Sequence, residues 1–477
     1  PLDFFGRKEY NELIKKIYKV RECAMQNYDY IVIGAGAANS FAFSAAAKGY
    51  KTLIIDESYP GGTCLNRGCI PTKVLLQSAD VAHYIKTSEM YGIKSKIESV
   101  DMSKIKQRVE DIVLFWRNRL IKALNNTPNL TFINKIAKFV SEKIIEIDGE
   151  KIRGNRFVLA VGSRPIIPKI EGLDRIKYLT NENILELTEL PKSIGILGGG
   201  YIGMEFAHFF HSLGSEVYII EMKDYLLNEI EESLRDNFNE YMRSEMKVFT
   251  ATALKSVYEN NNKKILVCEN NSGKFEIAVD ELLVAVGRRS NADKLDCVKT
   301  NVILNNYGYI IADEYLQTSN SDIWALGDCI GTPAFRHTAN YQCDILEKNL
   351  LFNKKIKADY SITPFAVFTF PEIASVGLTA SAARQKYQKI TIKKLGYFGN
   401  AKGKAIGYKG FCKAVIDDNT EKILGFHIIG PYASILIHEI LPIMTAGLSY
   451  KKIEETIHIH PALSELIIWT FTEGKEI

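Results

Sequence analysis

The sequence predicts an α/β protein in which one strand–loop–helix–strand unit occurs twice, followed by a smaller α+β domain. The two units begin with apolar strands at residues 28–33 and 193–197, and each strand runs directly into a glycine-rich loop. No such loop occurs after about residue 352, where short strands alternate with helices. We expect these strands at 364–370, 410–416 and 423–429, and these helices at 432–441 and 451–458.

The first unit has the pattern of a dinucleotide-binding loop. After its strand come Gly34 and Gly36, a helix over 40–48, and a strand at 51–55 that ends at Asp56. The two glycines allow a tight turn and the close approach of a pyrophosphate to the helix N-terminus, and an acid about 20 residues further on can bind a ribose hydroxyl. Asn39 stands where the third glycine of this pattern belongs.

The second unit repeats this pattern with all three glycines, Gly198, Gly200 and Gly203. A helix over 204–212 and a strand at 216–220 follow, and Glu221 ends the strand. A chance origin would require two accidental glycine clusters, each with its strand, helix and terminal acid. We therefore expect two dinucleotide sites in one chain.

Two similar strand ends mark where the chain crosses between domains. A long amphipathic helix over 101–125 and a few short strands lead to Gly162 and Ser163, and a later strand at 282–286 leads to Gly287.

The pattern of residues 1–24 predicts a short amphipathic helix. Alternatively, this segment is a tag or an upstream start, because the nucleotide-binding domain could begin at Met25. The predicted domains are 25–163 with 288–351 for the first dinucleotide, 164–287 for the second, and 352–477 for subunit contact.

Cys64 and Cys69 lie shortly after the first loop, and a thiol pair beside a bound dinucleotide indicates redox chemistry. Cysteines at this spacing can close a small ring if the segment enters a helix. The alternative is a pair of buried, inert thiols. Gly62 and Gly68 weaken that alternative because they let the backbone pass close to a flat ligand, and Lys73 adds a positive charge that favours a thiolate.

Composition excludes several classes of protein. The chain has 477 residues, and 46% of them are hydrophobic. Its net charge is only +4, and Lys and Arg are interspersed among Asp and Glu, so the sequence gives no indication of binding to nucleic acid or to an anionic membrane. No apolar run approaches the roughly 18 residues of a membrane span. The 8 cysteines show no secreted framework. We expect a soluble, cytoplasmic protein that acts on small molecules, and we assign no metal site.

The run 61–73 and the C-terminal run 458–465 resemble the corresponding motifs of the pyridine nucleotide-disulfide oxidoreductases, most closely those of the dihydrolipoamide dehydrogenase group. The resemblance extends from about residue 27 to the end. It implies a homodimer with FAD at the first loop and a nicotinamide cofactor at the second. It also implies a redox disulfide in which Cys64 exchanges with substrate and Cys69 lies against the flavin. His460 of the partner subunit, oriented by Glu465, would take and return the thiol proton.

The resemblance also implies the cofactor contacts. Lys73 and Glu205 would form a buried ion pair near the flavin, the alternative being two exposed side chains. For FAD the implied residues are Gly34, Gly36, Asp56, Thr63, Lys73, Gly162, Ser163, Asp328 and Ala339. For the nicotinamide cofactor they are Gly198, Gly200, Gly203, Glu205, Glu221 and Gly287.

The resemblance does not identify the substrate. Glu221 favours NAD, because a carboxylate binds both ribose hydroxyls and repels a 2′-phosphate. The first candidate substrate is a small dithiol or the lipoyl domain of a 2-oxoacid dehydrogenase complex. Alternatives are reduction of another low-molecular-weight disulfide, such as a mycothiol-type one, or of a metal ion. Mercury is disfavoured because no second cysteine pair stands near the C-terminus, and glutathione because Glu221 occupies a usually basic position. A non-catalytic redox sensor is the alternative of another class.

Overall fold

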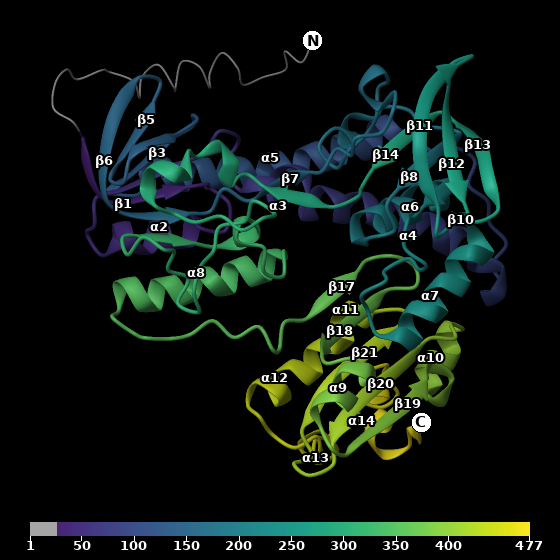
Figure 1. Cartoon of the computed structure of the whole chain (residues 1–477). Helices are drawn as coiled ribbons and strands as arrows, with labels where there is room; N and C mark the ends of the chain where they lie inside the picture. The colour runs from purple at the N-terminus through teal and green to yellow at the C-terminus, as the bar shows by residue number, and fades with distance from the viewer. Residues whose placement is uncertain (1–25) are drawn as a thin grey trace.

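The computed structural model describes residues 26–477, so the helix predicted within residues 1–24 lies outside the described residues. Figure 1 shows two α/β bodies next to each other and a C-terminal domain below them, drawn in green to yellow. The predicted α/β class with a C-terminal α+β domain is confirmed. Within residues 26–477, no helix combines the length and the apolar character needed to cross a bilayer.

The first body is a sheet of order β3-β2-β1-β6-β5-β4, with β16 paired to the end of β6. Alternate residues of β1 face opposite cores: Tyr30 and Val32 pack with helices α2 and α8, and Ile31 and Ile33 pack on the other face. The strands are β1 (Asn27–Ile33), β2 (Thr52–Ile55), β3 (Leu130–Ile133), β4 (Lys138–Ser141), β5 (Ile144–Ile147), β6 (Glu150–Leu159) and β16 (Ile323–Ala325); the helices are α2 (Asn39–Ala47) and α8 (Arg336–Leu351).

The second body is a parallel sheet of order β10-β9-β8-β14 with an antiparallel three-stranded sheet, β11-β12-β13, packed against it. The antiparallel sheet was missed in the sequence. The elements are β8 (Ser193–Leu197), α6 (Tyr201–Leu213), β9 (Glu216–Ile220), α7 (Glu232–Glu245), β10 (Lys247–Phe249), β11 (Ala253–Asn260), β12 (Lys263–Asn270), β13 (Gly273–Val279) and β14 (Glu281–Val284).

Two kinds of element join these bodies. Strands β7 (Ser163–Pro165) and β15 (Arg288–Ser290) pair antiparallel, each directly after one of the predicted crossing points. Helix α4 (Cys69–Thr87) contacts both α5 (Met102–Asn126) and α6, while α5 contacts β3 of the first sheet. The Asp101 carboxylate caps α5 by accepting the Lys104 N–H at 2.9 Å. Helix α3 (Gly62–Arg67) precedes α4, and the two cysteines lie on this pair of helices.

The C-terminal domain is a sheet of order β17-β18-β21-β20-β19-β22 covered by short helices. Its strands are β17 (Phe365–Val367), β18 (Ile373–Gly377), β19 (Ile390–Gly396), β20 (Phe411–Asp417), β21 (Ile423–Ile429) and β22 (Lys475–Glu476). Its helices are α9 (Ala380–Lys386), α10 (Ala401–Ile406), α11 (Ala433–Leu436), α12 (Ile440–Thr445), α13 (Lys451–Glu454) and α14 (Glu465–Thr472).

Three predicted elements of this domain differ from the structure. The helix expected over 432–441 is broken into α11, a 3-10 turn at Ile437–Glu439 and α12. Pro442 explains the break, because it has no N–H to continue the earlier helical register and is tolerated in the first turn of a new helix. The strand expected over 364–370 is shortened to β17, and the helix expected over 451–458 is shortened to α13.

Candidate active site

One cavity of about 2470 Å³ joins both glycine-rich loops to the cysteine pair. A usual small-ligand pocket has roughly 300–1,000 Å³, so this cavity has room for two extended ligands. It is lined by every predicted cofactor residue except Gly203, and by Cys64 and Cys69. The predicted residues are therefore brought together although they come from segments throughout the first 340 positions.

The first loop forms a backbone cradle at the edge where β1 and β2 both end. Gly34 has φ +112°, and a Cβ there would lie 2.1 Å from the Ala160 carbonyl oxygen. The Asp56 carboxylate accepts N–H bonds from Ala35 at 2.6 Å and Ser58 at 2.8 Å. Burial raises the pKa of Asp56 to about 6. Position 34 therefore requires glycine, and the Asp56 carboxylate is held beside the loop by two hydrogen bonds.

The second loop repeats this geometry. Gly198 has φ +113°, and a Cβ there would lie 2.4 Å from the Ala285 carbonyl oxygen. The Glu221 carboxylate accepts N–H bonds from Gly199 at 2.6 Å and Lys223 at 2.7 Å. At Gly200 a Cβ would meet nothing within 4 Å, so this glycine leaves open space beside the loop. Both loops thus have the backbone shape and the acid that a dinucleotide requires.

The third position of the motif differs between the loops. A Cβ on Gly203 would lie 2.1 Å from the Gly198 carbonyl oxygen, so only glycine lets α6 pack against its strand. Asn39 occupies the matching position in the first loop, where α2 begins, whereas α6 begins two residues before Gly203. The Asn39 amide donates to the carbonyl oxygens of Ala35 at 2.7 Å and Gly36 at 2.9 Å. The Asn39 side chain therefore links two backbone carbonyl groups of the first loop.

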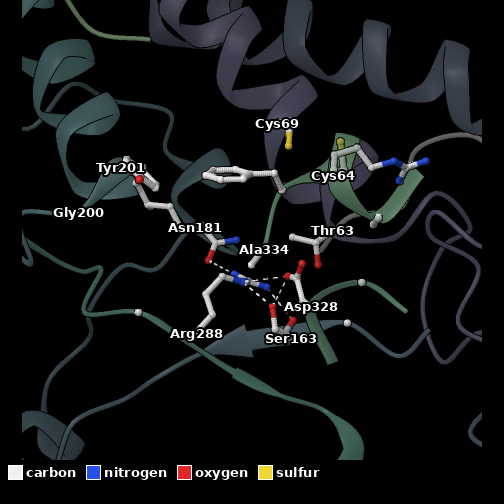
Figure 2. Close-up of a pocket in the computed structure, with 18 of the residues that line it drawn as sticks. Thr63, Cys64, Cys69, Ser163, Asn181, Gly200, Tyr201, Arg288, Asp328 and Ala334 are labelled. Atoms are coloured by element: carbon white, nitrogen blue, oxygen red, sulfur yellow. Dashed lines mark hydrogen bonds and ion pairs between the residues drawn. The ribbon is translucent and has the colours of Figure 1, made fainter. Parts of the chain in front are cut away.

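The two cysteines are free thiols on adjacent helices, Cys64 in α3 and Cys69 at the first position of α4 (Figure 2). Gly68 separates the helices, and a Cβ there would lie 2.9 Å from the Thr63 carbonyl oxygen. A hydrogen bond from Cys64, helped by the Lys73 charge, lowers the pKa of the Cys69 thiol to about 6. The same hydrogen bond, with burial, raises the pKa of Cys64. The pair therefore has one thiolate and one thiol near neutral pH.

Lys73 and Glu205 form the predicted ion pair, in which Glu205 is buried and Lys73 is only partly buried. The Lys73 Nζ lies 2.6 and 2.7 Å from the two Glu205 carboxylate oxygens. The ammonium also lies 4.3 Å from the centre of the Phe368 ring, and the Phe368 N–H donates to Glu205 at 3.3 Å. This contact links α4, α6 and the segment after β17. It keeps a positive charge beside Cys69.

A polar network at the cavity wall contains two residues that the sequence analysis missed. The Ser163 hydroxyl donates to Asp328 at 2.5 Å, and Arg288 donates to Ser163 Oγ at 2.8 Å and to Asn181 Oδ1 at 3.1 Å (Figure 2). Arg288 directly follows the predicted Gly287, which was the available signal. Asn181 had none, because it lies in an irregular segment between the domains.

His460 and Glu465 form a dyad outside this cavity. The His460 Nδ1 lies 2.9 Å from Glu465 Oε1, and the Ala462 N–H donates to Glu465 Oε2 at 3.0 Å. The bond to His460 lowers the pKa of Glu465. The His460 side chain is 69% exposed, and neither residue lines the cavity that contains Cys64. Within one chain the dyad is therefore formed but is not part of the thiol site.

Two dinucleotide cradles and a thiol–thiolate pair in one cavity define the class of dinucleotide-dependent dithiol–disulfide oxidoreductases. Residues 28–343 match the family model described as pyridine nucleotide-disulphide oxidoreductase, and residues 363–471 match that of its dimerisation domain. The chain belongs to the pyridine nucleotide-disulphide oxidoreductase family, whose members use FAD and NAD(P)H.

Several relatives of different specificity resemble the whole chain. A dihydrolipoyl dehydrogenase of Chlamydia trachomatis is 35% identical, with 92% of this chain and 95% of that protein covered. A mercuric reductase of Bacillus cereus is 32% identical, with 93% of this chain and 72% of that protein covered. A mycothione reductase of Mycobacterium tuberculosis is 32% identical, with 93% of this chain and 98% of that protein covered. The solved structure of the HOCl-induced flavoprotein disulfide reductase RclA from Escherichia coli superposes on this structure with a TM-score of 0.84. The two sequences are 28% identical, and 93% of this chain and 99% of that chain are covered.

Proposed function

We propose that this chain is an NAD-linked dihydrolipoamide dehydrogenase-type enzyme that moves two electrons between a dithiol and NAD. The observation that carries the proposal is the inequality of the two thiols in the cavity: one is held as a thiolate and its neighbour as a thiol. FAD, when bound, supplies the relay between a two-electron hydride donor and a thiol pair. The likeness to the dihydrolipoyl dehydrogenase of Chlamydia trachomatis supports the choice of substrate.

In this proposal Cys64 is the exchange thiol and Cys69 the thiol that faces the flavin. A substrate thiolate attacks Cys64 in the oxidised pair, and the Cys64–Cys69 bond breaks to release Cys69 as a thiolate. The second substrate thiol then attacks the mixed disulfide, which leaves the substrate as a disulfide and Cys64 as a thiol. The low pKa of Cys69 makes it the better leaving group for the first exchange.

The proton that these exchanges release needs an acceptor, and we assign that role to His460 of the partner subunit, oriented by Glu465. The exposure of the His460 side chain supports the assignment, because this histidine does not line the thiol cavity of its own chain and is accessible to a second chain. The neighbouring side chains of Ile457 and Ile459 are 98% and 79% exposed. Such apolar side chains beside a polar dyad fit a surface that a second copy covers, and the chain carries the family's dimerisation domain.

The residues around each glycine-rich loop have the chemistry needed to bind one of the two cofactors. The first, with Gly34, Gly36 and Asp56, would hold FAD; its further contacts would be Thr63, Lys73, Gly162, Ser163, Asp328 and Ala339. The second would hold NAD through Gly198, Gly200, Glu205 and Gly287, with Gly203 supporting the loop. The Glu221 carboxylate is fixed at its rim by two N–H bonds and would repel a 2′-phosphate.

A second candidate is the reduction of another small disulfide, and the match to 98% of a mycothione reductase favours it. A substrate panel separates the two: dihydrolipoamide with NAD, several oxidised low-molecular-weight thiols with NADH or NADPH, and Hg(II) with either. We expect the highest kcat/KM for dihydrolipoamide with NAD. A higher value for an oxidised thiol or for Hg(II) would move the assignment to that substrate. Turnover of no substrate by the FAD-loaded protein would support a redox sensor.

A cytoplasmic location is part of the same proposal, as is a physiological partner that is either a small dithiol or disulfide or a lipoyl domain. The second is tested by comparing free dihydrolipoamide with a reduced lipoyl domain under the same conditions.

A further inference from the structure

Arg336 places a guanidinium group close to the exchange thiol. It is the first residue of α8, is partly buried, and lines the same cavity as Cys64. Its Nη1 donates to the Gly61 carbonyl oxygen at 3.4 Å, and Gly61 lies three residues before Cys64 at the start of α3. Its Nε donates to Asn340 Oδ1 at 3.0 Å. These bonds hold the side chain across the gap between α8 and α3.

No acidic side chain among the described residues forms an ion pair with Arg336. Several other cations of the cavity pair with carboxylates: Lys73 with Glu205, Arg288 with Asp328, and Lys294 with Glu57. Both oxygens that accept hydrogen bonds from Arg336 are neutral, and within residues 26–477 no carboxylate lies within 4 Å of its guanidinium. A guanidinium forms up to five hydrogen bonds, so most of its donors stay available to a ligand.

The field of this charge reaches the sulfur of Cys64. The hydrogen bond with Cys69 and burial raise the pKa of Cys64, and the Arg336 charge acts in the opposite direction. The same field attracts any anionic group on a substrate whose sulfur approaches Cys64. Arginine is well suited to that task because its planar fork matches a carboxylate.

We propose that Arg336 binds an anionic group of the substrate, so that the site prefers small dithiols and disulfides that carry a carboxylate. This inference rests on the proposed function, because it takes Cys64 as the atom that meets the substrate. A neutral amide of the same shape would keep the sulfur chemistry and lose the charge contact. The preference therefore concerns substrate binding and not the redox step.

Dihydrolipoate and dihydrolipoamide test this inference, since they share one dithiol and differ in a carboxylate against an amide. In both reactions the dithiol becomes a disulfide and loses two electrons and two protons; NAD⁺ takes a hydride and one proton enters solution. We expect a higher kcat/KM for dihydrolipoate. Arg336→Gln should reduce the ratio of the two kcat/KM values roughly 3- to 10-fold, the range for a hydrogen-bonded charge contact at a partly exposed site. The change should lie mainly in KM.

Matched controls keep the result specific. Arg336→Lys keeps the charge and should retain most of the preference, and Arg384→Gln removes an exposed arginine of α9 outside the cavity and should leave the ratio unchanged. Rising salt should lower the preference of the wild-type enzyme, because salt screens a partly exposed charge. Dithiodipropionate against its diamide, with NADH as donor, repeats the comparison on a shorter molecule.

The outcomes separate this inference from the proposed function. Equal kcat/KM values for acid and amide in the wild-type enzyme, or a loss in Arg336→Gln that is the same for both, would overturn the role of Arg336 while leaving dithiol turnover standing. If the FAD-loaded protein turned over no dithiol or disulfide, the proposed function itself would fail.

Discussion

The proposed chemistry depends on a difference between two identical side chains. Cys64 and Cys69 are five positions apart, yet the hydrogen bond between them lowers the pKa of one and raises that of the other. Lys73 adds to the asymmetry from the next turn of α4, where Glu205 holds it in place. The sequence predicted that a positive charge stands near the thiols, and the structure shows which thiol it favours.

Serine substitutions test the two roles. Cys64→Ser should abolish dithiol turnover and still leave a thiolate at Cys69, so the FAD-loaded protein should keep a long-wavelength absorbance of the kind that a thiolate close to oxidised flavin produces. Cys69→Ser should lose that absorbance. Visible spectra of the two purified variants, with turnover assays beside them, provide the measurement. Reversed spectra, or wild-type turnover in either variant, would contradict the assignment.

The pKa of Cys69 predicts a pH dependence for the same absorbance. Its hydrogen bond from Cys64 holds the pKa at about 6, below the usual thiol value, so the thiolate persists at neutral pH and is protonated as the pH falls through that value. In enzyme reduced at the cysteine pair, the band should therefore decline with a midpoint about pH 6. Lys73→Gln removes a charge that lowers this pKa and should move the midpoint upward. A downward or absent shift would count against the contribution of Lys73.

The glycines of these two loops are needed for three different reasons. Gly34 and Gly198 are needed for left-handed backbone and for close approach to a neighbouring strand, while Gly200 has ordinary backbone and open space beside it. Gly203 has a different reason again, since it brings α6 onto its own loop. Consecutive glycines of one motif thus serve ligand access and helix packing separately.

A pair of alanine variants separates these uses. Gly200→Ala places a methyl group in the open space of the loop and should raise the KM for NADH while changing the melting temperature little. Gly203→Ala places a methyl group 2.1 Å from the Gly198 carbonyl oxygen and should destabilise the protein by roughly 1–3 kcal/mol. Thermal unfolding and NADH kinetics on both variants give the comparison. The interpretation is wrong if Gly200→Ala is the destabilised variant and Gly203→Ala binds NADH and unfolds as the wild type does.

In the complete molecule the two dinucleotide cradles and the thiols meet in one cavity, and the acid–base dyad does not. Helix α4 begins with Cys69 and contacts α6 of the second unit, so it brings the thiols between the two cradles. His460 lies in the C-terminal domain with exposed isoleucines beside it. In the proposed mechanism, His460 of the partner subunit would complete the site.

A mixture of two inactive variants tests this requirement. His460→Gln should still bind FAD and accept hydride from NADH, and should exchange thiols about 10²–10⁴-fold more slowly, the usual loss for a missing acid–base group. A heterodimer of this variant with Cys64→Ser has one site with both defects and one with neither. Subunit exchange should restore part of the turnover. Verified heterodimers without recovery would show that Cys64 and His460 act within one chain.

Features that lie within one local unit follow from the amino-acid sequence alone. Both glycine loops with their acids, the cysteine pair and the strands and helix that flank each glycine loop could be predicted, because hydrophobic periodicity and turn residues act between near neighbours. Contacts between distant groups follow only from the folded chain: Arg288 contacts Ser163 and Asn181, and Arg336 contacts the loop before Cys64. These contacts depend on how strands more than 100 residues apart pair, as β16 does with β6, and no local pattern encodes that packing.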